Sequence, residues 1–236
     1  EKTGVDYPGE AGSIMYALKD VGPVELATIG YGQSISVTPI QLLTAVNAIG
    51  NDGVLLQPHY VKALTDSDGK VVKEFEPTIV RKVLSAKTAK EMRSIMQYVV
   101  DNGGGGAFKV DGYKVGGKTG TANKPNAGGY SDTTYSSVIA MAPMDDPQVC
   151  VLLIVDNPKG VHYASVTAGP GVKQILSDTL RYLNVSPDEE TETKTAAEKV
   201  KVPDVTGSSV EDAIGILSGQ GLSYDMDKSA ESEDFV

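Results

Sequence analysis

The chain has 236 residues, 40 % of them hydrophobic, a length and composition typical of a globular protein with a substantial core. Its net charge is −10, and residues 186–236, with 13 acidic and 4 basic side chains, carry −9 of it, which argues against a basic surface for nucleic acid. No run of about 18 apolar residues predicts a membrane-spanning helix. One cysteine and two histidines offer neither an intrachain disulfide nor the ligands of an ordinary zinc site, so we expect no metal and no cofactor.

The first half of the chain predicts a helix and a hairpin. Residues 38–50 open with Thr-Pro-Ile-Gln, in which Thr38 is the expected N-cap and the glutamine completes a capping box. Apolar residues then recur at helical spacing until Gly50 ends the helix. Further along, residues 60–64 and 71–75 form two strand-like segments around a turn rich in Asp, Ser and Gly.

The second half predicts a helix, three strands and a final helix. Ser85 caps the first of these helices, which stops near the four consecutive glycines of residues 103–106. Because no Gly-Lys-Ser or Gly-Lys-Thr follows them at the spacing of a phosphate-binding loop, we predict a flexible loop beside a cleft. Strand periodicity then appears at residues 114–122, 135–142 and 149–155. With a last helix after Pro170, the pattern predicts an α+β fold in which helices flank an antiparallel sheet.

The last quarter of the chain has a different composition. Residues 186–200 lack aromatic side chains and are rich in charge, which is typical of a linker. Residues 201–236 follow as a short module, with a helix that we expect Ser208 to cap and a strand over residues 222–226. Because about 36 residues rarely fold alone, we interpret this module as truncated.

Residues 118–121, Lys-Thr-Gly-Thr, are the candidate binding site. On a strand, Thr119 and Thr121 lie on one face, where both hydroxyls can donate to a single carboxylate. Gly120 has no side chain and lets a ligand approach the strand edge closely. Lys118 points to the opposite face, but its long stem can bring a positive charge around the strand end. The segment therefore predicts an anion clamp.

Several segments, in order, resemble the class B penicillin-binding transpeptidases. They are the Lys-Thr-Gly-Thr-Ala strand, the Ser-Ser-Val-Ile-Ala-Met-Ala-Pro strand after it, and upstream segments that begin at Thr3, Gly30 and Thr38. The resemblance implies that residues 1–185 are the C-terminal part of a transpeptidase domain. The implied fold is that of the penicillin-binding transpeptidases and serine β-lactamases, in incomplete form.

The terminal module has its own resemblance. Residues 201–236 are similar to the start of a PASTA repeat, a small α+β module that accompanies such enzymes in Gram-positive division and spore-wall synthesis. This implies the chain's order: the C-terminal part of a transpeptidase domain, an acidic linker over residues 186–200, and a partial PASTA repeat.

The resemblance also implies a reaction and a set of partners. Enzymes of this family form a serine acyl-enzyme with a peptidoglycan stem peptide that ends in D-Ala-D-Ala, and β-lactam antibiotics mimic that end. By match to the motif, Lys118 and Thr121 would be catalytic, Thr121 through an oxyanion-hole N–H. The substrate carboxylate would be bound by Lys118, Thr119, Gly120 and Thr121. A membrane glycosyltransferase is a further expected partner, and the expected location is the extracytoplasmic face of the cell membrane, with an anchor upstream.

Two motifs of the family are absent from the chain. The only Ser-x-x-Lys begins at Ser67, in the predicted hairpin turn, where its lysine cannot lie one helical turn from the serine, and no Ser-x-Asn occurs. In class B enzymes both motifs precede the segment that begins here at Thr3. We therefore expect a D,D-transpeptidase whose serine lies upstream, so that this chain alone is inactive. Two alternatives stay open: a non-catalytic β-lactam or peptidoglycan sensor, and a wall-binding module that acts through residues 201–236.

Overall fold

The computed structural model describes residues 2–126, 129–188, 202–222 and 224, which fall into two compact units, Glu1–Lys90 and Glu91–Val236. Helix α3 (Ala86–Asn102) runs across the division between them. The strands pair antiparallel in both units, which confirms the predicted α+β class. In the described part of the chain, no helix combines the length and the apolar character needed to span a bilayer.

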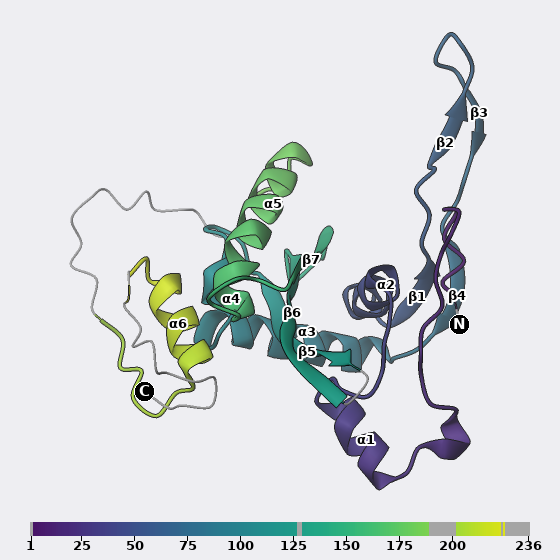
Figure 1. Ribbon diagram of the computed structural model, residues 1–236. Coiled ribbons are helices and arrows are strands. Elements are labelled where there is room, and N and C mark those ends of the chain that lie inside the picture. The colour runs from purple at the N-terminus through teal and green to yellow at the C-terminus, as the bar shows by residue number, and fades with distance from the viewer. Residues whose placement is uncertain (1, 127–128, 189–201, 223, 225–236) are drawn as a thin grey trace. The chain divides into compact units, whose positions relative to one another are not determined.

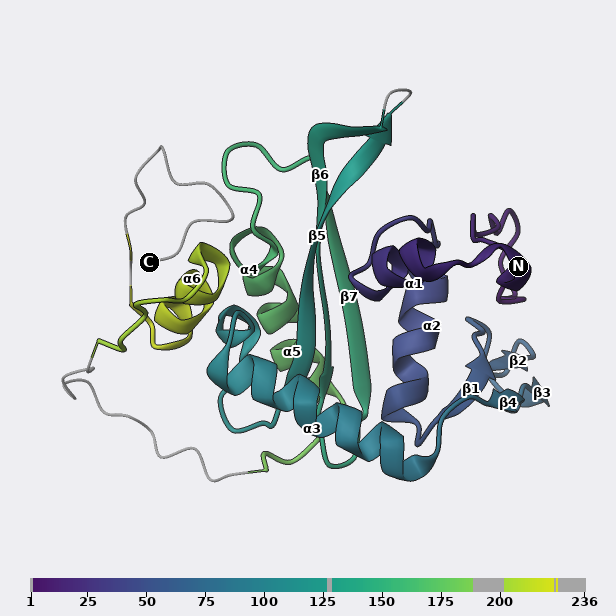
Figure 2. The same ribbon diagram turned by 90° about the horizontal axis from the view of Figure 1, so that it is seen from below.

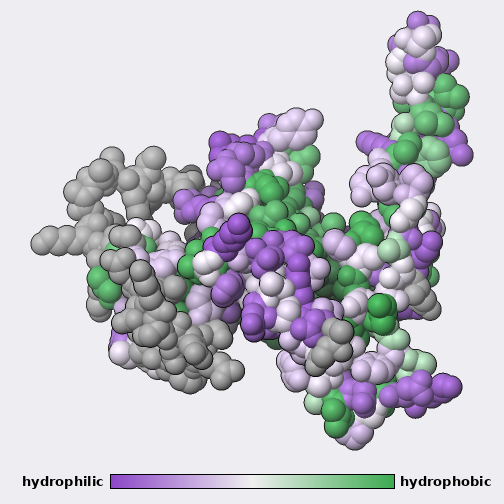
Figure 3. All heavy atoms as spheres, in the orientation of Figure 1, coloured by the Kyte–Doolittle hydropathy of each residue, from purple (hydrophilic) through white to green (hydrophobic). Residues whose placement is uncertain are grey.

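The first unit contains two small sheets of two strands each (Figure 1). β1 (Val54–Gln57) pairs with β4 (Thr78–Lys82), and β2 (Ala63–Thr65) pairs with β3 (Val71–Glu74). The β2–β3 hairpin is the predicted one, and the β1–β4 pair is an addition to the prediction. Every residue of β3 and β4 is exposed, and Figure 3 shows apolar surface along the hairpin. A ribbon of two strands has no further strands with which to build a covered layer.

Helix α2 (Pro39–Gly50) begins with the predicted capping box. The Gln41 N–H donates to the Thr38 hydroxyl oxygen at 3.3 Å, and the Thr38 N–H donates to the side-chain oxygen of Gln41 at 2.8 Å. Two backbone donors that the helix itself cannot satisfy are thereby paired. Two further helical segments, η1 (Leu18–Asp20) and α1 (Pro23–Gly30), precede it.

The turn between β2 and β3 contains the Ser-x-x-Lys sequence. Asp66 Oδ1 accepts the N–H groups of Asp68 and Lys70 at 3.0 and 2.9 Å. Gly69 adopts a positive φ of 80°, which glycine reaches without steric cost. Ser67 therefore lies in a tight hairpin turn, as predicted, and not on a helix that could present it as a nucleophile.

The second unit is built on a three-stranded sheet in the order β5-β6-β7 (Figure 2). Its strands are β5 (Gly116–Asn126), β6 (Gly129–Ala142) and β7 (Val149–Asp156). These are the three predicted strands. β5 and β6 extend beyond their predicted ends as a two-stranded ribbon, whose register shifts between Asn123 and Pro125.

Two helices lie on one face of this sheet, in agreement with the prediction that helices flank it. α4 (Ala164–Thr167) and α5 (Gly169–Tyr182) both contact the strands (Figure 2). α5 begins earlier than predicted, so Pro170 lies in its first turn, where the N–H that proline lacks has no helical partner in any case. α3 begins after Ser85, whose hydroxyl oxygen accepts the Thr88 N–H at 3.0 Å. This confirms the predicted cap.

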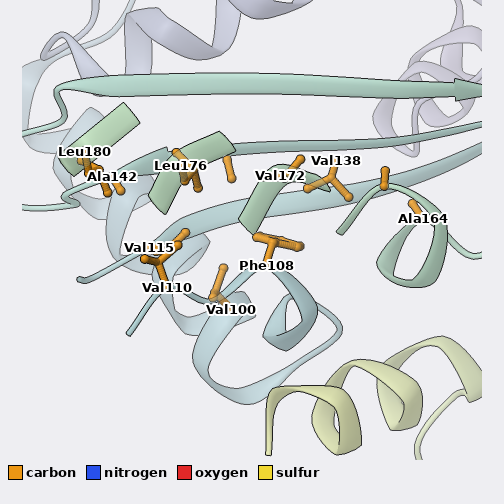
Figure 4. Packing of buried hydrophobic residues seen from close by; sticks show 12 residues of the cluster. Val100, Phe108, Val110, Val115, Val138, Ala142, Ala164, Val172, Leu176 and Leu180 are labelled. Carbon is orange, nitrogen blue, oxygen red and sulfur yellow. The ribbon is translucent and has the colours of Figure 1, made fainter. Parts of the chain in front are cut away.

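The core lies between the sheet and these helices (Figure 4). It includes Phe108, which belongs to the short helix η2 (Gly106–Phe108) after α3. The fully buried side chains of β6 and α5 meet here, namely Val138, Ala140, Ala142, Val172, Leu176 and Leu180. Alternate residues of β6 face these helices, and Ile139 and Met141 on the opposite face of the strand are buried as well, which agrees with the continuous apolar run of residues 138–142.

The terminal module contributes helix α6 (Val210–Gly219) to the described structure. Its N-cap is Ser209, whose hydroxyl oxygen accepts the Asp212 N–H at 3.2 Å. The prediction of Ser208 as the cap is wrong by one residue. The helix starts at Val210, so Asp212 is its third residue, and the residue directly before the helix, Ser209, accepts the Asp212 N–H. Most of the predicted linker, and most of the strand predicted over residues 222–226, lie outside the described residues.

Cys150 lies in β7, opposite the fully buried Met141 of β6. Its side chain is partly buried, and burial raises the pKa of its thiol to about 12. The thiolate is the nucleophilic form of cysteine, so a raised pKa lowers the reactivity of this thiol at neutral pH.

Candidate functional site

The predicted binding segment lies on β5, at the edge of the three-stranded sheet. Lys118 is paired in register with Ile139, Thr119 with Val138, Gly120 with Ser137, and Thr121 with Ser136. Among the described strands, β5 has a neighbour on one side only. An edge strand keeps half of its backbone N–H and C=O groups free of the ladder, so β5 can offer them to a ligand.

The register places the predicted residues on the two faces of the sheet as the sequence indicates. Thr119 shares a face with Val138, because directly paired residues point to the same side. Thr121 lies further along that face. Lys118 and Gly120 share the opposite face with Ser137. The hydroxyls and the ammonium group therefore approach the edge of β5 from two sides.

Lys118 is exposed, and its side chain folds along its own strand. Its Nζ donates to the backbone oxygen of Thr119 at 2.9 Å. The ammonium group is thus already held near the strand edge, as the length of the stem predicts. Thr121 is exposed and Thr119 is partly buried.

The two glycines before Lys118 are needed for close packing. A Cβ on Gly117 would lie 2.7 Å from the Phe108 ring and 2.6 Å from the Ile139 backbone oxygen. A Cβ on Gly116 would lie 2.4 Å from the Met144 side chain. Both distances to Gly117 are shorter than a side chain tolerates. The start of β5 is therefore seated directly on the core.

Ser137 is a candidate site residue that the sequence analysis missed. It lies opposite Gly120 on the Lys118 face, and its Oγ donates to the Gly120 backbone oxygen at 3.3 Å. A Cβ on Gly120 would come within 2.9 Å of that Oγ. The signal was present in the Ser-Ser sequence of the following strand, but only the strand register reveals which serine meets the glycine.

A charged cluster lies on β5 beyond the site. Lys124 forms an ion pair with Asp156 of β7, and its ammonium group lies 4.5 Å from the centre of the Tyr135 ring. The side-chain hydrogen bond to Asp156 raises the pKa of Lys124 above its usual value. These contacts connect all three strands at the end of the sheet remote from the core.

The upstream segment that begins at Thr3 is a loop held by its own carboxylates. The Thr3 hydroxyl and N–H both donate to Glu10 Oε1 at 2.6 Å. The two oxygens of Asp6 accept the N–H groups of Tyr60 and Val61 at 2.7 and 3.0 Å. These hydrogen bonds lower the pKa of both carboxyl groups. The segment thus has a structural role within the first unit.

The arrangement on β5 suits recognition of a small anion that lies along a strand. It combines a lysine ammonium, two threonine hydroxyls and a glycine that leaves space at the backbone. In the described part of the chain, no group of three His, Cys, Asp or Glu side chains is placed to hold a metal ion. The chemistry that these residues can provide is electrostatic and hydrogen-bonding.

Comparison with known protein families places these residues in a family. The family described as the penicillin binding protein transpeptidase domain matches residues 1–177. The stage V sporulation protein D of Bacillus subtilis is 41 % identical over 228 residues, which cover 92 % of this chain and 35 % of that protein. A probable peptidoglycan D,D-transpeptidase of Neisseria meningitidis is 35 % identical over 84 % of this chain and 32 % of that protein. The chain spans about a third of the length of these relatives.

Solved structures show the same relationship. Penicillin binding protein 3 of Mycobacterium tuberculosis, in complex with ampicillin, superposes with a TM-score of 0.71 at 29 % identity, over 81 % of this chain and 45 % of that one. The transpeptidase domain of penicillin-binding protein 3 from Burkholderia pseudomallei gives a TM-score of 0.67 at 35 % identity, over 79 % of this chain and 55 % of that one.

Proposed function

Since the chain belongs to the penicillin-binding protein transpeptidase domain family, we propose that its Lys-Thr-Gly-Thr strand binds the terminal carboxylate of a peptidoglycan stem peptide. The observation that carries the proposal is the position of residues 118–121 on an edge strand, with an exposed ammonium group folded back toward that edge. Charge-assisted hydrogen bonds to a carboxylate are the strongest that such a strand can form.

In the proposed reaction, the chain supplies binding and polarisation. A serine hydroxyl attacks the carbonyl between the two terminal D-alanines, its proton passes to a base, and the last D-alanine leaves as its amine is protonated. Lys118 contributes positive charge beside the serine. Thr119 and Thr121 bind the carboxylate, and the Thr121 N–H contributes one oxyanion donor, a role worth about 3 kcal/mol of transition-state stabilisation.

None of the serines of this chain lies in a motif that marks the nucleophile of the family. The single Ser-x-x-Lys, at Ser67, lies in a hairpin turn, and the sequence holds no Ser-x-Asn. We expect the nucleophile to come from residues outside these 236. The chain alone would then bind β-lactams and stem peptides without being acylated by them.

The relatives guide the wider proposal. One is a sporulation protein and another is a probable peptidoglycan D,D-transpeptidase, and a structural relative was solved with aztreonam and with ampicillin. We extend to this chain a role in cell-wall cross-linking at the outer face of the membrane, with β-lactams as inhibitors. A membrane glycosyltransferase partner and a partial PASTA repeat at residues 201–236 belong to the same proposal.

Acylation is tested by incubating the chain with a fluorescent penicillin and measuring its intact mass. The expected result is an unmodified mass. A stoichiometric adduct would show that the chain contains its own nucleophile, and this part of the proposal would then fail.

Binding is tested separately, by titrating the chain with a short peptide that ends in D-Ala-D-Ala and following backbone amide signals by NMR. The Lys118→Ala variant should bind at least about tenfold more weakly, because one charge-assisted hydrogen bond contributes about 1.5–3 kcal/mol. The same peptide with a C-terminal amide should bind as weakly to the wild-type chain, since it has no carboxylate.

The matched control is Lys173→Ala, which removes an exposed lysine on α5. This variant should bind like the wild type. Equal affinity for the acid and the amide peptide, or no effect of Lys118→Ala, would contradict the carboxylate clamp. Tight peptide binding that depends on residues 201–236 and not on Lys118 would favour the wall-binding alternative.

A further inference from the structure

The four consecutive glycines of residues 103–106 do not form the flexible loop that the sequence predicts. Gly104, Gly105 and Gly106 are all buried, and Gly106 begins helix η2. Helix α6 of the terminal module contacts η2, and Figure 2 shows it beside the end of α3. The prediction is wrong because a glycine run also forms a surface on which another backbone can pack closely.

The contact between α6 and this glycine run is made backbone to backbone. A Cβ on Gly215 would lie 2.5 Å from the Gly104 Cα, and a Cβ on Gly106 would lie 2.3 Å from the Gly215 backbone oxygen. Gly219 lies one turn after Gly215 on the same face of α6, and a Cβ on Gly219 would lie 3.0 Å from the Gly106 Cα. Glycines from both partners therefore interlock, and a side chain at either centre would force the two segments apart.

Apolar side chains complete the buried face of α6. Val210, Ala213 and Ile214 are 8 %, 3 % and 3 % exposed. α6 also contacts α4, one of the two helices that cover the sheet. A helix that presents three buried apolar residues and two interlocking glycines to the same neighbours is a docked element, which explains how so short a module obtains a core.

The glycine run is in turn connected to the start of β5. A Cβ on Gly105 would lie 3.1 Å from the Phe108 ring, and the same ring lies 2.7 Å from the Cβ position of Gly117. Gly117 directly precedes Lys118. From α6 to the Lys118 strand, the contacts thus pass through the glycine run and one aromatic ring, all of them in the second unit.

We propose that residues 103–106 form a docking seat for helix α6, and that the docked helix holds η2 and the start of β5 in place. The terminal module then acts as an intramolecular brace on the strand that carries Lys118. The proposal rests on packing within the second unit. It does not depend on the ligand assigned to Lys118 or on any reaction.

The test is hydrogen exchange of the full chain, measured by mass spectrometry, in the wild type and in Gly215→Ala. Alanine favours a helix over glycine by about 1 kcal/mol, so any loss of protection in this variant cannot arise from a weaker α6. We expect the amides of residues 103–109 to exchange at least about tenfold faster, and those of residues 116–121 to follow them.

Gly219→Ala should give a smaller change in the same segments, because its added methyl meets the seat at a longer distance. Gly30→Ala is the matched control, since Gly30 also lies in a helix and a Cβ there has no atom within 4 Å. It should leave the exchange of residues 103–121 unchanged.

Gly106→Ala removes the seat from the other side. Combined with Gly215→Ala, it should add little to the single variants, because both break one contact. If residues 103–109 keep their protection in Gly215→Ala, the docking seat is refuted. Faster exchange there without any change in residues 116–121 would refute the brace on β5.

Discussion

The β5-β6-β7 sheet and the β2–β3 hairpin are both antiparallel, yet they bury their side chains to opposite extents. Val138 of β6 is fully buried beneath α5, whereas Val72 of β3 is 69 % exposed. Both valines have the same intrinsic preference for a strand. The difference arises because the first has a layer of helices over it within its own unit and the second lies in a ribbon of two strands. Burial in this chain follows the number of layers rather than the strand propensity of the residue.

The most direct test of this comparison is to truncate one leucine in each region to alanine. Leu176→Ala in α5 should lower the free energy of unfolding by about 3 kcal/mol, because it leaves a cavity in a closed core. Leu64→Ala in β2, where the side chain is 50 % exposed, should cost less than about 0.5 kcal/mol. Urea unfolding followed by circular dichroism measures both, and similar losses would contradict the layer argument.

A second prediction tests the core where it meets the candidate site. Gly117→Ala places a methyl group against the Phe108 ring and a backbone oxygen, and should cost about 2 kcal/mol. Gly12→Ala in the first unit is the control, since a Cβ there meets no atom within 4 Å. Thermal unfolding should separate the two variants clearly. A neutral Gly117→Ala would mean that the start of β5 is loosely packed.

Where burial is low, local hydrogen bonds should carry more of the stability. Thr38→Ala removes the side-chain half of the α2 capping box and should destabilise that helix by about 1 kcal/mol. Hydrogen exchange of the α2 amides measures this change within the first unit. Thr38→Ser keeps the hydroxyl and loses only the methyl group, so it should restore the protection. If the loss in Thr38→Ala came from packing of the methyl group alone, Thr38→Ser would not restore it.

The smallest expected effect concerns pH in the first unit. Hydrogen bonds from the Tyr60 and Val61 N–H groups lower the pKa of Asp6 below its usual value in the folded state, so the ionised carboxylate is the form that stabilises. Its contribution is complete above the unfolded pKa and disappears as pH falls through the lower, folded value. Asp6→Asn should therefore accelerate exchange of the Tyr60 and Val61 amides near neutral pH, and its difference from the wild type should shrink in acid. A difference that is independent of pH would contradict the assignment.

The sequence predicts those elements whose signal is local. The capping box at Thr38 and the cap at Ser85 mark the starts of α2 and α3 correctly. The strand-like segments and the almost wholly apolar run of residues 149–155 locate the three strands of the larger sheet. The sequence does not predict the β1–β4 pair, since the evenly half-buried β1 and the fully exposed β4, about twenty residues apart in sequence, carry no periodic burial signal.

The candidate site shows the same division between local and tertiary information. The two faces occupied by Lys118 and Thr119 follow from the period of a strand, and the register confirms them. Ser137 required the register itself, which the sequence does not contain. The buried packing of Gly104 and Gly106 required knowledge of a helix more than a hundred residues further on. The glycine composition of residues 103–106 predicted a flexible loop, and their packing against α6 shows that this prediction is wrong.

The position of Cys150 has a practical consequence for studying this chain. Its thiol, with a pKa of about 12, is almost entirely protonated at neutral pH, and protonated thiols react slowly with maleimides. An exposed cysteine with an ordinary pKa should therefore react with a maleimide faster than Cys150 does. A Ser218→Cys substitution on α6, or Asn123→Cys on β5, would carry a fluorophore to the element of interest without prior removal of the native cysteine.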